Sequence, residues 1–189
     1  MLNIQRLCII FLTFSIALSV PEAQDEPFEE WDPYFERGDV SYSAAVGFST
    51  WWGRFGLSLT PAAEAIIHEY RIGEVVPLSF GIAGLGNATT DLRAAGADLG
   101  VTVAGLGTAH LGFKNVSEPL EWLEKFDVYI GLGPGFEIIQ PDWYNGARLR
   151  LASMQGTNYF IRENFAVFLE NTYLGRYRNY FSAGVRWKI

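Results

Sequence analysis

The two histidines, His68 and His110, are the residues whose chemistry could serve a metal ion or a proton transfer. Neither lies in an HxH or HExxH pattern, and neither has carboxylates at a metal-ligand spacing. His68 follows Glu64 by four residues, and His110 lies in a glycine-rich stretch. We therefore predict that both side chains fill polar space inside the fold, and that the chain binds no metal and no cofactor.

Other catalytic and nucleotide-binding motifs are missing from the sequence. Gly-Leu-Gly begins at Gly84, Gly105 and Gly131, but it never forms GxGxxG between a strand and a helix. Gly131, Gly133 and Gly135 are expected to make room for larger neighbours inside the fold. No GxSxG motif and no recognisable Ser, His and Asp set occurs. We predict that the protein is not an enzyme, with a barrel acyltransferase acting on lipid A as the alternative.

Several ionisable residues share one parity within apolar, alternating stretches of the chain. They are Glu64, His68, Asp127, Glu137, Arg148, Arg150, Glu170, Arg186 and Lys188. Their charges nearly balance, which buried groups require and a solvated surface does not. We predict that these residues form a structural ionic network on the inner face of the fold.

Strands must position these residues, and the chain supplies the alternating patterns of strands. In the last ten residues, Phe181, Val185 and Trp187 share one parity, while Ser182 and Arg186 share the other. Eight stretches predict strands: Val40–Ser49, Leu57–Arg71, Pro77–Asn87, Asp98–Phe113, Phe126–Glu137, Ala147–Ile161, Phe165–Tyr173 and Tyr180–Ile189.

The connecting segments carry signals of their own. Asn87–Gly96 predicts a polar loop, and Gln140–Gly146 has the composition of a turn. Ser117–Lys125 predicts a short helix, because a serine can cap its start and a proline suits its first turn. Pro61 indicates a bulge or a late start in the second strand.

Residues 1–23 predict a signal peptide. Arg6 precedes the apolar run Leu7–Val20, and small residues up to Ala23 suggest a cleavage site there. The run is short for a bilayer-spanning helix, which needs about 20 residues, although an uncleaved anchor is the alternative. The only cysteine, Cys8, lies in this segment, so we expect a mature protein without disulfides.

Residues 24–39 form an acidic stretch in which seven acids are balanced only by Arg37. Residues 40–189 hold thirteen acids and twelve bases and offer no basic face for nucleic acid. We predict that the acidic stretch is a flexible N-terminal tail. Alternatively, its aromatic residues, among them Trp31, Tyr34 and Phe35, dock on the barrel rim or on a periplasmic partner.

These elements predict an all-β fold over residues 40–189. A membrane barrel turns its apolar parity outward and its polar parity inward, whereas a soluble barrel does the reverse. The shared parity of the charged residues, and aromatic residues at strand ends such as Phe126, Tyr173 and Trp187, favour the membrane form. We predict an eight-stranded antiparallel transmembrane β-barrel with a short periplasmic helix, and a soluble exported barrel is the alternative.

Asn158–Tyr173, followed by Tyr180–Ile189, resembles the last hairpin of the small outer-membrane β-barrel domain proteins, which include the OmpW- and OmpX-like barrels of diderm bacteria. Phe126–Ile138 resembles their fifth strand, although these families usually end in Phe and this chain ends in Ile189. The resemblance implies periplasmic termini, four surface loops and an outer-membrane location. It also implies contact with outer-membrane lipid and with the barrel-assembly machinery through the C-terminal strand.

The expected function is therefore that of a structural or surface-exposed outer-membrane barrel. Side chains fill the interior of an eight-stranded barrel, which argues against a general diffusion porin. OmpW-like passage of small hydrophobic molecules is one alternative, and an adhesin role is another.

Overall fold

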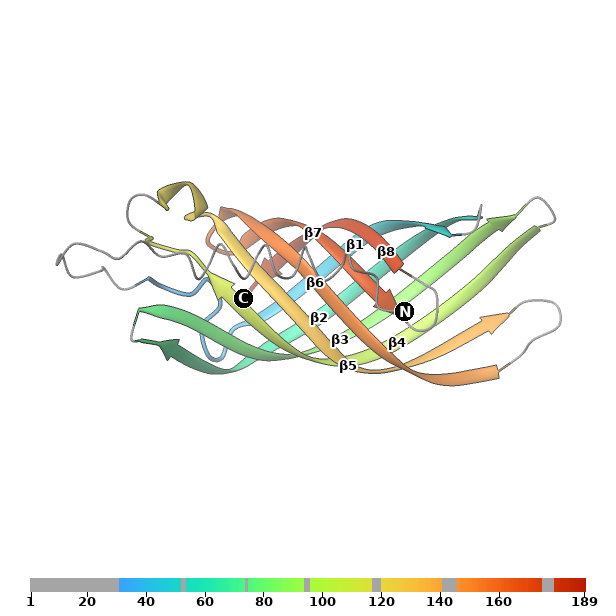
Figure 1. Cartoon of the computed structure of the whole chain (residues 1–189), viewed down its shortest axis with the longest axis horizontal. Coiled ribbons are helices and arrows are strands. Elements are labelled where there is room, and N and C mark those ends of the chain that lie inside the picture. Colours follow the sequence, from blue (N-terminus) through green and yellow to red (C-terminus); the bar gives the residue numbers. More distant parts are fainter. Residues whose placement is uncertain are drawn as a thin grey trace.

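The computed structural model describes residues 31–51, 54–73, 75–93, 96–116, 120–140, 146–174 and 179–189 (Figure 1). The predicted signal peptide and residues 24–30 of the acidic stretch lie outside these residues. The eight strands are β1 (Val40–Trp51), β2 (Arg54–Ile72), β3 (Val76–Arg93), β4 (Gly96–Gly112), β5 (Phe126–Gln140), β6 (Gly146–Arg162), β7 (Phe165–Leu174) and β8 (Asn179–Lys188).

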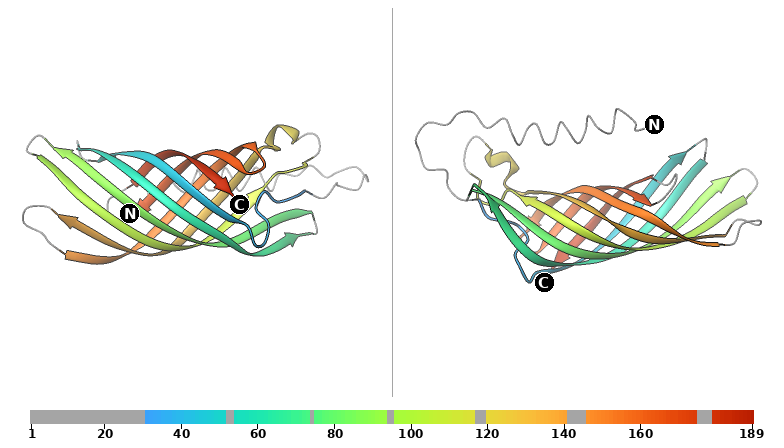
Figure 2. Two further views of the ribbon diagram at one scale, coloured as in Figure 1. Left: turned by 180° about the vertical axis from the view of Figure 1, so that it is seen from behind. Right: turned by 60° about the horizontal axis from the view of Figure 1, so that its bottom comes forward.

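The strands form one closed antiparallel barrel in chain order, and pairing of β1 with β8 closes it. Val40 and Ile189 lie together at one end, where their main chains exchange two hydrogen bonds. We call this the termini end (left in Figure 1) and the opposite one the loop end. The strands are tilted in both views of Figure 2 and are 10 to 19 residues long. A tilted strand needs about 9–11 residues to cross a bilayer.

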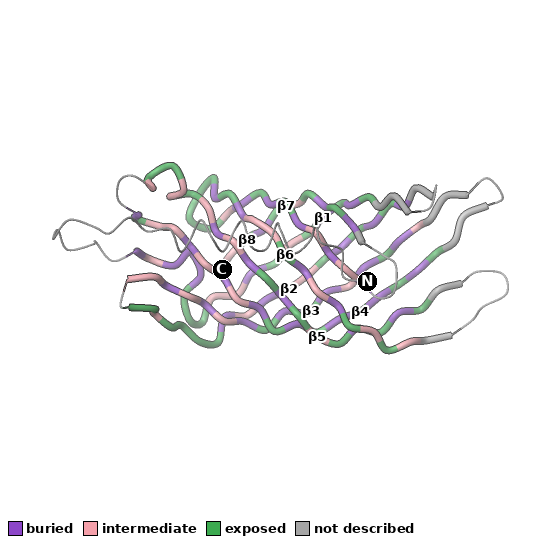
Figure 3. The backbone as a smooth tube through the Cα atoms, in the orientation of Figure 1, coloured by how far each residue is buried: buried purple, intermediate pink, exposed green. Residues whose placement is uncertain are grey.

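Residues alternate between exposed and buried along the strands (Figure 3). The outer wall is apolar, whereas the charged side chains of the strands and most of their other polar ones lie inside, together with an apolar layer. Val46 is 63 % exposed on the outer wall, whereas Asp127 is 0 % exposed inside. This arrangement is the reverse of a soluble barrel. The predicted eight-stranded antiparallel fold is confirmed, and the soluble alternative is not supported by the burial pattern.

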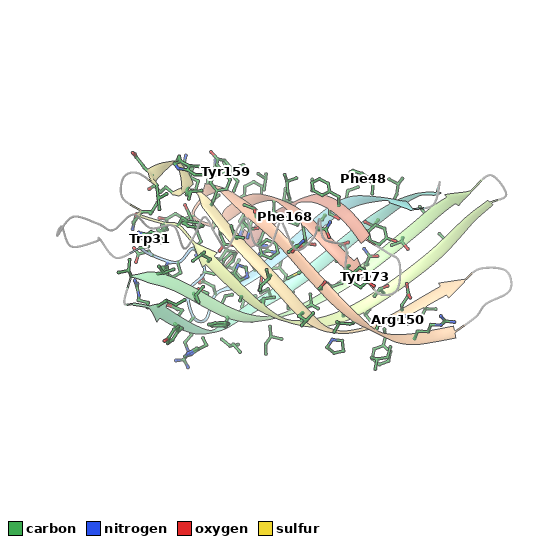
Figure 4. The ribbon with its side chains drawn as sticks, viewed as in Figure 1. Trp31, Phe48, Arg150, Tyr159, Phe168 and Tyr173 are labelled. Carbon is green, nitrogen blue, oxygen red and sulfur yellow. The ribbon has the colours of Figure 1, made fainter. Side chains whose placement is uncertain are left out.

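Aromatic side chains gather on the outer wall toward the termini end. The rings of Phe165 and Trp187 are 6.3 Å apart, and those of Phe126 and Tyr159 are 5.2 Å apart. Tyr42 is opposite Trp187 across the β1–β8 pairing and is also exposed. Such rings suit the boundary between hydrocarbon and headgroups. Toward the loop end, exposed Phe48 points away from the barrel (Figure 4).

Two predicted connections differ from the structure. The predicted loop Asn87–Gly96 is mostly strand, because β3 continues to Arg93 and β4 already begins at Gly96. Its polar residues Asn87 and Thr89 are buried inside the barrel, while Ala88 faces outward. The polarity that predicted a loop therefore belongs to the inner face of a strand.

The predicted helix Ser117–Lys125 is reduced to the single 3-10 turn Glu121–Leu123, and its first three residues lie outside the described part. In the described ranges, no helix has the length and apolar character needed to cross a membrane. The bulge predicted at Pro61 is misplaced: the β2–β3 register does not shift there, but between Ile66 and His68.

Candidate functional site

His110 is the centre of a buried ionic network inside the barrel. It is 2 % exposed, with Nδ1 3.0 Å from Asp127 Oδ2 and Nε2 2.9 Å from Glu64 Oε1. Carboxylates only accept hydrogen bonds, so both contacts are satisfied when both ring nitrogens carry a proton. Asn158 Nδ2 also donates to Asp127 Oδ2 at 2.7 Å, and Thr108 donates to Glu64. The three charged groups come from β2, β4 and β5, so the network ties separate strands together.

Arg186 and Glu170 form the other half of the network. Arg186 Nη1 lies 3.4 Å from Glu64 Oε2, and the guanidinium stacks 4.5 Å from the Tyr129 ring. The Tyr129 hydroxyl donates to Glu170 Oε2 at 2.7 Å, and Thr172 donates to the other carboxylate oxygen. Buried charges are tolerated only when they are paired and hydrogen-bonded. Arg186 is paired with Glu64, and the Glu170 carboxylate accepts from two buried hydroxyls, whereas Arg186 Nε has no hydrogen-bond partner among the described residues.

Four further predicted residues lie away from this centre. Arg150 Nε is 3.6 Å from Glu137 Oε2, and Arg148 stands opposite Glu137 across the β5–β6 pairing. This group lies nearer the loop end, and Arg150 is labelled there in Figure 4. Lys188 lies at the termini end, with Nζ 3.0 Å from Asp39 Oδ2. The predicted network is therefore divided into three groups.

His68 does not belong to the network. Its side chain is exposed and lies against Phe80, with ring centroids 6.5 Å apart. Ile66 before it is buried, and the register shift between these two residues adds one position to β2. Counting every second residue from Glu64 predicts that His68 faces the interior, and this prediction is wrong because the shift turns His68 outward. His110, in contrast, is predicted only as a polar filler, and the structure places it at the centre of the network.

An apolar layer separates the charged group around His110 from the group formed by Glu137 and Arg150. From the termini end to the loop end, the inward residues of β4 run His110, Thr108, Leu106, Ala104 and Thr102. Leu106 packs in one cluster with Leu85, Met154, Leu174 and Tyr180. The adjoining cavity, lined in part by Glu64, Glu170 and Arg186, has a volume of about 10 Å³, which is room for roughly one water.

Glycines allow this tight packing. A Cβ on Gly131 would lie 2.9 Å from Met154 Cγ, and one on Gly156 would lie 2.6 Å from the Tyr129 hydroxyl. Gly131 therefore makes room for a larger neighbour, as its pattern in the sequence indicates.

The aromatic part of the acidic stretch is packed into the termini end of the barrel. Phe35 is 1 % exposed, and Trp31 and Tyr34 are buried as well. Trp31 lies at that end in Figure 4. The flexible-tail interpretation is therefore wrong for these three residues, and docking on the barrel is what the structure shows.

Replacing Glu170 with leucine is expected to destabilise the barrel more than replacing Leu169 with alanine. Glu170→Leu leaves the buried hydroxyls of Tyr129 and Thr172 without their acceptor, which costs about 1–3 kcal/mol for each unsatisfied group. Leu169 lies exposed on the outer wall, so its truncation leaves no cavity inside. Urea unfolding in detergent, read by heat-modifiable gel mobility, measures both losses. Equal shifts for the two variants would refute this role of Glu170.

No group of three or more His, Cys, Asp and Glu side chains in the described ranges is arranged to hold a metal ion. The network residues are instead bonded to one another, so their chemistry is that of internal ion pairing.

Two solved structures of similar fold are the N-terminal β-barrel domain of Pseudomonas aeruginosa OprF and the Yersinia pestis attachment invasion locus protein Ail. The OprF domain is 14 % identical, with a TM-score of 0.54, and the match covers 81 % of this chain and 98 % of that one. Ail, solved with the heparin analogue sucrose octasulfate, is 12 % identical with a TM-score of 0.50, covering 82 % and 100 %. No protein-family model matches the chain, and no curated protein matches it. At these identities the likeness is one of fold: a small, closed, eight-stranded β-barrel of the kind found in outer membranes.

Proposed function

We propose that this protein is a small structural or surface-exposed barrel of the bacterial outer membrane, without catalysis and without passage through its interior. The observation that carries the proposal is the filled interior. Aromatic side chains at the termini end, the ionic network around His110 and the apolar layer around Leu106 follow one another along the axis. A solute crossing the interior would have to disrupt all three.

The outer wall supports a membrane location. Its exposed residues are long aliphatic side chains in the middle and aromatic side chains toward the ends, which is the distribution that hydrocarbon and headgroups favour. The predicted signal peptide supplies a route of export. Lipid is then the main partner of the outer wall. The β8 strand, with exposed Trp187 near its end and exposed Ile189 directly after it, is the proposed contact for the barrel-assembly machinery.

Planar-bilayer recording tests whether the interior conducts. The purified, refolded protein is expected to give no single-channel steps, because the ionic and apolar groups fill the interior. A heat-denatured sample serves as the control for detergent leak, and an established porin shows that the bilayer responds. Reproducible steps from the folded protein alone would contradict the proposal.

OmpW-like passage of small hydrophobic molecules is the second candidate, and a feature of the outer wall favours it. The β4–β5 pairing skips Gly105–Leu106 against Gly133–Pro134, and Pro134 has no N–H to donate. An open groove of about 470 Å³ lies next to this interruption and is lined by Leu132, Gly133, Pro134, Leu149, Arg150 and Leu151. Uptake of an apolar dye by cells with and without the protein tests this candidate, and equal uptake excludes it.

Adhesion and enzymatic activity are tested separately. For adhesion, deletion of the loop-end connections should abolish binding to host cells or matrix while leaving the folded barrel intact. For an enzyme acting on lipid A, a strain lacking the protein should show altered lipid A, and unchanged lipid A ends that idea.

A further inference from the structure

The aromatic segment, residues 31–35, is held through its main chain as well as through its side chains. Four groups of the barrel bond it: Arg71 Nη1 donates to Trp31 O (2.8 Å), Lys188 Nζ donates to Tyr34 O (2.7 Å), Ser79 Oγ donates to Phe35 O, and Lys114 O accepts from Asp32 N (2.9 Å). Pro33 favours an extended conformation in the residue before it. Four main-chain atoms of the segment are therefore bonded by groups from separate parts of the fold.

Phe35 is the side chain that anchors the segment. Its ring lies 4.6 Å from the His110 ring and 5.7 Å from that of Phe160. Arg186 and Lys188 place cations 5.7 and 6.0 Å from the ring centre. The anchor therefore rests on the ionic network itself, in a pocket of aromatic and cationic groups.

Tyr34 and Gly112 show how closely the segment fits. The Tyr34 ring stacks on Phe160 with centroids 4.0 Å apart, and its hydroxyl donates to Glu124 O at 2.6 Å. Burial raises the pKa of Tyr34 to about 12, so the hydroxyl remains a donor at neutral pH. A Cβ on Gly112 would lie 2.7 Å from Tyr34 N, so this position of β4 must be glycine for the segment to bind.

The barrel closes without the aromatic segment. The β1–β8 pairing extends from Ser41 opposite Lys188 to Phe48 opposite Phe181, and the hydrogen bonds between Val40 and Ile189 complete it. Gly38 separates this pairing from the segment and has a φ of 98°, a conformation that glycine adopts easily. The chain can therefore change direction at Gly38 while β1 stays paired.

We propose that the termini end of the barrel is a binding site for an aromatic peptide, occupied by the chain's own residues 31–35. The segment leaves and rebinds about Gly38 while the barrel stays closed, and its departure opens the His110 network to water from the termini end. A free peptide of the same sequence competes for the site. This inference goes beyond the proposed function, because it does not depend on what the loop end or the outer wall does.

The test uses a single thiol placed under the segment. Ser79 is buried and bonds Phe35 O, so Ser79→Cys in the full chain with Cys8→Ser reports whether the segment covers the site. The readout is the rate of labelling by a small charged methanethiosulfonate reagent on the folded protein in detergent. The parent is expected to label slowly. Phe35→Ala is expected to label about tenfold faster or more, the factor that corresponds to about 1.4 kcal/mol of binding energy.

Competition separates a binding site from simple loosening of the core. In the Phe35→Ala variant, a free peptide of residues 31–39 at about millimolar concentration should restore slow labelling, since short linkers give effective concentrations in that range. The same peptide with alanine in place of Phe35 should not restore it. Fast labelling with no protection by the wild-type peptide would overturn the proposal, and so would slow labelling in Phe35→Ala.

Two glycines on β4 supply matched variants. Gly112→Ala blocks the site, so it should label fast and gain no protection from the peptide. Gly105→Ala adds the same methyl group where nothing lies within 4 Å, and should label as slowly as the parent. Heat-modifiable mobility shows that each variant is folded, and Phe35→Leu replaces Phe35→Ala if the latter is not. If neither Phe35 variant nor Gly112→Ala folds, the segment is part of the barrel core and the proposal is wrong.

Discussion

Replacing Arg186 with methionine is expected to lower the free energy of unfolding by about 3–5 kcal/mol, as removal of one partner from a buried ionic network does. Methionine keeps much of the apolar volume against the rings of Tyr129 and Phe168 but removes the charge. Glu64 and Glu170 then remain buried with less positive charge nearby. Urea unfolding of the refolded protein in detergent or lipid vesicles measures the loss.

Lys188→Met is the matched control, since it is the same substitution two residues further along β8. Lys188 lies at the termini end and is partly exposed. Its ion pair with Asp39 contributes about 0–1 kcal/mol, and its hydrogen bond to Tyr34 O adds about 1 kcal/mol, so the expected loss is below that of Arg186→Met. The double variant Arg186→Met with Glu64→Gln should recover part of the loss, because it also removes a carboxylate. Equal losses for Arg186→Met and Lys188→Met would mean that the buried network contributes no more to the free energy of unfolding than a partly exposed ion pair does.

Replacing Gly184 with alanine is expected to lower the free energy of unfolding by about 3 kcal/mol, because it crowds the pairing that closes the barrel. The added Cβ would lie 2.4 Å from Ala44 O and 2.6 Å from the Phe168 ring, at the pairing of β8 with β1. A main-chain oxygen cannot move aside without separating the two strands. Overpacking usually costs about 1–3 kcal/mol, and this position is at the upper end because backbone is involved. The folded fraction after refolding, read by heat-modifiable mobility, measures the effect.

Gly84→Ala is the control for that result. Gly84 also lies within a strand, but nothing stands within 4 Å of its Cβ position, and it faces outward. This variant should fold as well as the parent, or better, because alanine restricts the unfolded chain more than glycine does. If Gly184→Ala and Gly84→Ala fold equally well, crowding between β8 and β1 does not explain the glycine at position 184.

The strands could be predicted from the sequence because burial in this fold has period two. Phe126–Glu137 illustrates this, since every second residue from Asp127 to Glu137 faces the interior in the structure. The same rule fails wherever the period breaks. His68 follows a register shift that no residue type announces, and so it appears on the exposed face.

Polarity alone also misleads at the ends of strands. Asn87 and Thr89 predicted a loop, because polar residues are common there, but inside this barrel polar residues are what a strand buries. Pairing within the network was likewise not predictable. His110, Asp127 and Glu64 come from three strands, and only the stagger of the closed barrel brings them within hydrogen-bonding distance. Docking of Phe35 depends on the same three-dimensional arrangement.

Closure through β1 and β8 also determines when the barrel can form. Residues 52–178 separate β1 from β8, so the barrel cannot close until β8 has been synthesised. Until then both strands present unpaired main-chain edges, which favour association with other chains. Formation of such distant pairs is slow compared with formation of local contacts. Separation of the chain from its own copies before closure therefore favours the barrel over aggregation.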